Sequence, residues 1–67
     1  MPSSVIDSYR YEPDERVLLI TFVSGQVYAY FDVPPDVDAG LRKASSRGRY
    51  FASHIRDHFS YRRLTPA

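Results

Sequence analysis

The stretch "VLLITFVSGQVYAYF", residues 17–31, decides the fold of this chain. It holds two runs of β-branched and aromatic residues, 17–23 and 26–31, on either side of Ser24 and Gly25. Such runs are typical of strands. Glycine accepts the positive φ that tight hairpin loops require. We therefore predict an antiparallel hairpin with Ser24 and Gly25 as a two-residue loop.

This loop length predicts which residues share a face of the sheet. Three apolar pairs result: Phe22 with Val27, Ile20 with Ala29, and Leu18 with Phe31. We expect helices to cover this face, where the small Ala29 leaves room for a helix side chain. A three-residue loop that puts Asp32 opposite Leu18 is less favourable. Tyr28 and Tyr30 are then expected on the other face, which antiparallel sheets can leave to solvent.

A further strand, residues 5–11, precedes the hairpin and is joined to it by a turn at residues 12–15. Ile6 and Tyr9 can both face the core only if this strand contains a bulge.

Two helices are expected after the hairpin. Pro34 and Pro35 stop the sheet, and Pro35 suits the first position of a helix in which Val37, Leu41 and Ala44 face the sheet. The second helix is predicted over residues 46–59, with Ser46 as its N-cap. Its buried stripe is Phe51, Ile55 and Phe59.

The C-terminal stretch, residues 61–64, forms either a short strand or a loosely packed tail. We therefore predict one α+β domain over residues 1–67: a three-stranded antiparallel meander followed by two helices packed on one face, with or without a short C-terminal strand.

Charge is distributed unevenly along the 67 residues, although the net charge is only +1. Residues 1–38 carry seven acidic and two basic side chains, whereas residues 39–67 carry seven basic and one acidic. Either the basic part meets an anionic partner, or the two parts complement each other within the fold. With no cysteine and no long apolar run, we expect a cytoplasmic protein without a membrane partner.

The first candidate binding feature is the pair Tyr28 and Tyr30. On an open sheet face these rings would stack on bases, contact a protein or close a homodimer. The alternative is that they are ordinary strand residues that cover Leu19 or lie under the C-terminal tail.

The second candidate feature is the basic loop "SSRGRYF" at residues 45–51. Arg47 and Arg49 in the first turn of a helix oppose its dipole, and Gly48 is a poor helix former. A phosphate bound at the helix N-terminus would explain all three residues, starting from Ser46. Alternatively, both arginines pair with the acidic first half and Gly48 fits a tight helix corner. Three further cations could meet phosphates: Lys43, Arg62 and Arg63.

Catalytic signatures are not found in the sequence. His54 and His58, four residues apart with Asp57 between them, lack the HExxH pattern, so we expect no metal site. There is no nucleophile elbow, Walker loop or dinucleotide fingerprint. We therefore expect neither a cofactor nor an enzyme.

The ordered set of motifs resembles the KTSC domain, a short module named for its place at the C-terminus of some lysyl-tRNA synthetases and also found alone in bacteria. The matching residues extend over 3–64: "SSVI" at 3–6, Tyr11, "LLITF" through Gly25, the YxY element at 28–30, Val33-Pro34, Leu41 with Ala44, "SRGRYF" at 46–51, and Ile55-Arg56. Asp38 departs from an aromatic residue common at that position.

The resemblance implies a family of unknown function for which RNA binding is suggested by the association with the synthetase. Together with the residues, it leads to the hypothesis of a non-catalytic module for RNA or another single-stranded nucleic acid, with Tyr28 and Tyr30 on bases and the arginines on phosphates. The alternative is a protein-interaction or self-association module that uses the Tyr28/Tyr30 face.

Overall fold

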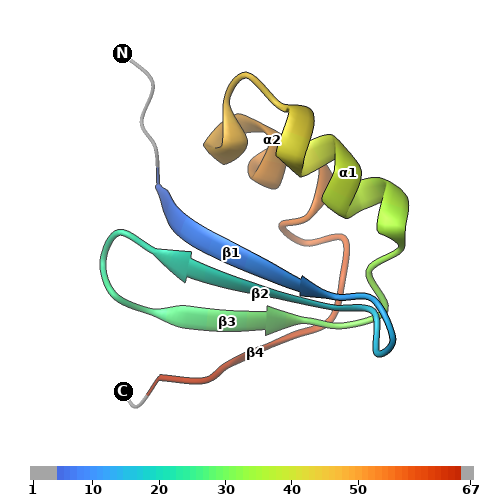
Figure 1. The fold of residues 1–67 in the computed structure, drawn as a ribbon. Helices are drawn as coiled ribbons and strands as arrows, with labels where there is room; N and C mark the ends of the chain where they lie inside the picture. The colour runs from blue at the N-terminus through green and yellow to red at the C-terminus, as the bar shows by residue number, and fades with distance from the viewer. Residues whose placement is uncertain (1–4, 66–67) are drawn as a thin grey trace.

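A computed structural model describes residues 5–65 and confirms the α+β architecture. Four strands form one antiparallel sheet in the order β1-β2-β3-β4, and both helices lie over the same face of it (Figure 1). The elements are β1 (Ile6–Glu12), β2 (Val17–Phe22), β3 (Val27–Tyr30), α1 (Pro35–Lys43), α2 (Arg47–His54) and β4 (Tyr61–Arg63). The C-terminal stretch therefore adds a fourth strand rather than a loose tail.

The loop between β2 and β3 has three residues, Val23 to Gly25, so the predicted two-residue loop is wrong. The Phe22 N–H donates to the Gln26 carbonyl at 2.9 Å, and the Gly25 N–H donates to the Phe22 carbonyl at 2.8 Å. Gly25 has a φ of 96°, the left-handed conformation that glycine tolerates and that closes three-residue hairpin loops. The added residue comes from the β2 side, which leaves Asp32 beyond the end of β3.

The longer loop shifts the register by one residue and reverses the faces of β3. Tyr30 now pairs with Leu18 and Tyr28 with Ile20, so both tyrosines lie on the helix-covered side. Tyr30 is only 4% exposed, and the predicted place of these rings on a helix-free face is wrong. The observed register places two tyrosine rings on the helix-covered face, where the predicted register would have placed the small Ala29. The larger rings bury more apolar area, and the stabilisation grows in proportion to that area.

A bulge in β1 brings its apolar side chains to the core, as the sequence indicates. Ile6 pairs with Phe22 but Ser8 pairs with Thr21, which leaves Asp7 as the extra residue. Ile6 is consequently buried, and Tyr9 also packs against the core.

The first helix begins at Pro35, as predicted. Asp38 is buried, and its carboxylate accepts a hydrogen bond from the Arg42 guanidinium one turn later. The pairing with Arg42 explains how α1 accommodates a carboxylate at a buried position. Where α1 and α2 meet, a Cβ on Gly40 would overlap the Tyr50 ring, so glycine permits their close approach.

The second helix begins after Ser46, whose hydroxyl accepts a hydrogen bond from the Arg49 N–H at 3.3 Å, but it ends at His54 rather than at residue 59. Two N–H groups, those of Ile55 and Arg56, share the Phe51 carbonyl.

The residues after α2 continue as a turn. Asp57 there has a φ of 65°, which no helix can continue. The predicted stripe is nevertheless turned inward, because Phe51 and Ile55 are buried and Phe59 packs against the core.

Val33 fixes the connection between β3 and α1. Its carbonyl accepts a hydrogen bond from the Tyr11 hydroxyl at 2.6 Å, and its N–H donates to the Arg16 carbonyl at 2.9 Å. Val33 is fully buried, so neither backbone group has water as a substitute partner.

Tyr11→Phe should therefore lower the free energy of unfolding by about 1–3 kcal/mol, because it leaves the buried Val33 carbonyl without its donor. Urea unfolding followed by circular dichroism measures this change. Tyr61→Phe is the matched control, since it removes a hydroxyl from a side chain that is 57% exposed. Equal effects of the two substitutions would contradict the assigned role of the Tyr11 hydrogen bond.

Candidate binding cleft

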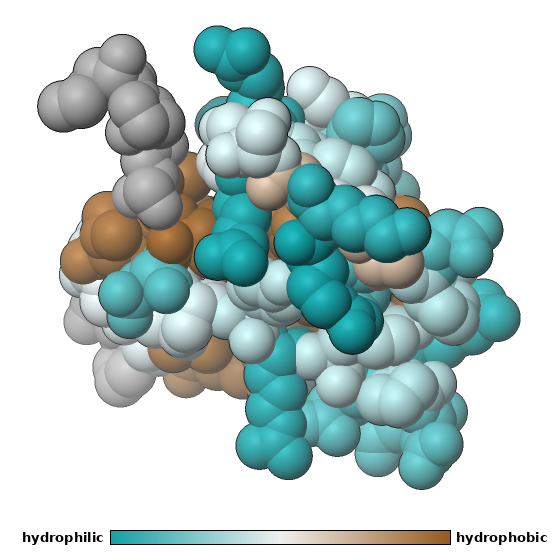
Figure 2. All heavy atoms as spheres, turned by 45° about the horizontal axis from the view of Figure 1, so that its top comes forward, coloured by the Kyte–Doolittle hydropathy of each residue, from teal (hydrophilic) through white to brown (hydrophobic). Residues whose placement is uncertain are grey.

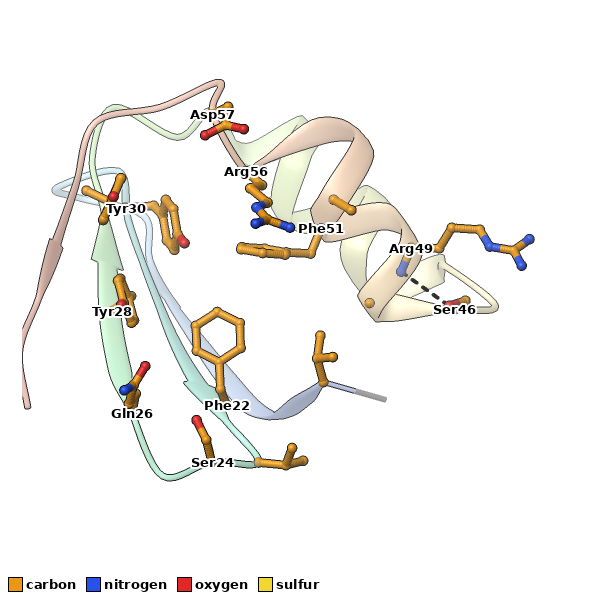
Figure 3. Close-up of a pocket in the computed structure, with 15 residues that line it drawn as sticks. Phe22, Ser24, Gln26, Tyr28, Tyr30, Ser46, Arg49, Phe51, Arg56 and Asp57 are labelled. Carbon is orange, nitrogen blue, oxygen red and sulfur yellow. Dashed lines mark hydrogen bonds between the residues drawn. The ribbon is translucent and has the colours of Figure 1, made fainter. Parts of the chain in front are cut away.

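A cleft of about 800 Å³ opens between the β2–β3 hairpin and α2 (Figure 3). The sheet forms one wall, α2 and the residues after it form the other, and β4 borders the cleft with Tyr61. The shifted hairpin register creates this cleft, because it turns the β3 side chains toward α2.

The walls of the cleft are aromatic. Phe22 lies edge to face against both Tyr28 and Phe51, with ring centroids 5.5 Å and 5.4 Å apart. Tyr30 packs edge to face on Phe51 at 5.6 Å, and Tyr61 from β4 lies 5.6 Å from both Tyr28 and Tyr30. A planar ligand would meet aromatic side chains from four elements of the fold: β2, β3, α2 and β4.

Arg56 is the cation that points into this cleft. Its guanidinium lies near the Phe51 ring, in the space between α2 and the sheet (Figure 3). The ion pairs found over residues 5–65 are Arg10 with Glu12 and Arg42 with Asp38, so Arg56 has no carboxylate partner within this part of the chain. Its hydrogen-bond donors are therefore available to a ligand.

The Tyr30 hydroxyl lies in a poorly hydrated part of the cleft. Burial, followed by the neighbouring phenols of Tyr28 and Tyr61, raises the pKa of Tyr30 to about 12, although the Arg56 charge acts in the opposite direction. Tyr30 therefore stays a neutral phenol, able to donate a hydrogen bond, throughout the physiological pH range.

This raised pKa predicts a loss of stability at alkaline pH. Below pH 10 the Tyr30 hydroxyl keeps its proton in both the folded and the unfolded chain. Between about pH 10 and 12 the unfolded chain releases this proton and the folded chain does not, so the free energy of unfolding falls.

Tyr30→Phe should remove this part of the pH dependence. Urea unfolding of both proteins from pH 9 upward, with phenolate absorbance at 295 nm, measures it. A Tyr30 absorbance step at pH 10 would contradict the effect of burial.

The structure brings four of the predicted site residues to one cleft: Tyr28, Tyr30, Gly48 and Arg49. Tyr28 and Tyr30 line the sheet wall, while Gly48 and Arg49 lie at the start of α2 together with the N-cap Ser46. The Arg49 guanidinium extends away from the cleft, so it lies at the rim rather than between the walls (Figure 3).

The remaining predicted cations lie elsewhere. Arg47 sits over the Tyr9 ring, with its guanidinium carbon 5.4 Å from the ring centroid, which gives it a contact within the fold. Lys43 ends α1, Arg62 pairs with Ala29 on the helix-free side of the sheet, and Arg63 follows it; none of the three lines the cleft.

Sequence reasoning did not place four of the residues that line the cleft: Phe22, Phe51, Arg56 and Tyr61. Phe22 and Phe51 were expected in the core: Phe51 is a buried member of it, and Phe22 packs against it. Arg56 was noted only beside Ile55 in the family resemblance, and nothing in its local pattern distinguishes it from a surface arginine.

Over residues 5–65 no three His, Asp or Glu side chains lie close enough together to hold a metal ion. The His54 ring instead stacks on Tyr50, 4.2 Å between centroids. No helix within the same residues combines the length and apolar character needed to cross a membrane.

Comparison with known proteins is consistent with this architecture. The family model of the KTSC domain matches residues 2–59. The chain belongs to the KTSC domain family. A crystal structure of a KTSC domain protein from Yersinia pestis has a TM-score of 0.90 and 35% identity, and covers 97% of this chain and 92% of that one.

KTSC relatives occur in two settings. A lysine–tRNA ligase from Nostoc sp. is 44% identical over 62 residues, which is 92% of this chain but 11% of the ligase. An uncharacterized protein from Stutzerimonas stutzeri is 37% identical over 65 residues, which is 96% of this chain and 92% of that protein. This KTSC chain thus corresponds to a small part of the ligase and to nearly all of the Stutzerimonas protein.

Proposed function

We propose that this KTSC domain is a non-catalytic module that binds single-stranded RNA in the cleft. The observation that carries the proposal is the meeting of five aromatic side chains with the unpaired guanidinium of Arg56 in one open space. Stacking of an unpaired base on an aromatic ring contributes about 1–3 kcal/mol in proteins that bind single strands. Arg56 adds charge-assisted hydrogen bonds that aromatic rings cannot supply.

Phosphates would follow the rim of the cleft. Arg49 opposes the dipole of α2, has no carboxylate partner within residues 5–65 and extends outward from the rim. Gly48 lines the cleft beside it. Lys43 and Arg47 belong to the same end of the helical layer. Arg62 and Arg63 on β4 would contact the phosphates of an RNA chain that continues past Tyr61.

The relatives support RNA as the partner. The Nostoc protein that contains a similar segment is a lysine–tRNA ligase, and tRNA is single-stranded at its loops and at its acceptor end. An RNA partner would also place this protein in the cytoplasm.

A second candidate function is the binding of an apolar peptide or of a second copy of the chain. It is favoured by Val5 and Val23, which line the cleft and are 40% and 65% exposed. Figure 2 shows apolar side chains at the edge of one face, bordered by hydrophilic ones. Such an interface would use the cleft and the exposed Val5 and Val23 at its edge. It would not use an open tyrosine face, because Tyr30 is buried.

The RNA proposal predicts that Arg56→Gln weakens binding of a fluorescein-labelled single-stranded RNA about tenfold or more, since it removes a charge-assisted contact. Fluorescence anisotropy at low and at physiological salt measures the dissociation constant. Arg10→Gln is the matched control: it removes the same charge from a side chain that is 77% exposed and lies outside the cleft.

Tyr28→Leu tests the stacking contribution separately, and it should weaken binding with little change in its salt dependence. If Arg56→Gln and Arg10→Gln weakened binding equally, charge alone would account for it and the cleft would not be the site. An absence of RNA binding at low salt would leave the apolar partner as the remaining candidate.

A further inference from the structure

We propose that the cleft selects guanine, with Arg56 and Asp57 reading two edges of the base. This inference rests on the proposed RNA binding and makes its ligand specific. It concerns one end of the cleft, where polar groups converge beside the aromatic walls.

Three polar groups meet at this end. Figure 3 shows Asp57 and Arg56 on the segment after α2, at the end of the cleft where Tyr30 extends from the facing sheet wall. The charges of Arg56 and Asp57 both act on the Tyr30 phenol, which agrees with their proximity. A base stacked in the cleft would therefore present its edges to a fixed set of donors and acceptors.

Arg56 and Asp57 keep their hydrogen-bonding capacity although they carry opposite charges and adjoin in the sequence. Their charged atoms are not among the ion pairs within 4.0 Å that residues 5–65 contain. The turn after α2 fixes the backbone that carries them: Asp57 has a φ of 65°, and the His58 N–H donates to the Ile55 carbonyl at 3.0 Å. Because neither neutralises the other, both can bind a ligand.

Guanine is the base that uses both groups fully. Its O6 and N7 atoms accept the two donors of an arginine fork, which is the commonest specific arginine contact to a base. Its N1–H and N2 amino group together offer two donors to one carboxylate, and a carboxylate can accept both. Adenine and cytosine offer a carboxylate only one amino group, and uracil only one N–H. The aromatic walls accept any base, so the discrimination falls to these two side chains.

The test is a comparison of five RNA pentamers that differ only in the central base: UUGUU, UUIUU, UUAUU, UUCUU and UUUUU, where I is inosine. Fluorescence anisotropy gives each dissociation constant. We expect UUGUU to bind about tenfold more tightly than UUUUU. Inosine, which lacks the N2 amino group, should fall between them because it loses one of the two donors to Asp57.

Asp57→Asn should reduce the preference for guanine over inosine, measured as the ratio of the two dissociation constants. Asparagine also adopts positive φ readily, so the turn is retained. Asp14→Asn is the matched control, because it neutralises an exposed aspartate in the β1–β2 turn, outside the cleft.

Equal affinity for all five pentamers would overturn the selection of guanine and leave the RNA-binding proposal intact. A preference for guanine over inosine that survives in Asp57→Asn would overturn the role of Asp57. No binding of any pentamer at low salt would instead contradict RNA binding itself, and this inference with it.

Discussion

The pairing of Leu18 with Tyr30 is the constraint on which the rest of the structure depends. Side chains alternate between the faces of a strand, so a slip of one residue would turn Tyr28 and Tyr30 away from α2. The core would lose the Tyr30 ring, and the cleft would lose its sheet wall. One additional loop residue, accommodated by Gly25 at positive φ, therefore determines both how this small chain packs and what it can bind.

Local signals in the sequence were sufficient for the order and type of the first three strands and both helices, whereas the C-terminal stretch was left open between a strand and a loose tail. Pro35 marked the start of α1 and Ser46 capped α2. The spacing of Ile6 and Tyr9 allowed both to face the core only with a bulge, and β1 contains one. The hairpin register was not a local property. Counting apolar pairs gave Ala29 the same weight as a tyrosine, whereas the fold is decided by buried area and by contacts with Phe51, more than twenty residues away.

The candidate site was only partly predictable, because it too depends on the hairpin register. Tyr28, Tyr30 and the start of α2 were recognised as unusual, but only the correct register brings the sheet and the helix together around one cleft. Arg56 was missed because a helix reaching residue 59 would have made it one more surface arginine. The helix ends at His54, and the turn that follows determines where Arg56 and Asp57 point.

The core and the cleft share side chains, and this links binding to stability. Tyr30 and Phe51 are buried members of the core and also line the cleft. A chain of 67 residues buries only about 60% of its unfolded surface, so it has few apolar contacts to spare. A ligand between these walls contacts groups that are assembled only in the folded state, and its binding therefore stabilises the fold by mass action. For the same reason, replacing a shared ring alters folding and binding together. Arg56 and Asp57 are exposed and lie outside the core, so they are the positions at which recognition can be separated from folding.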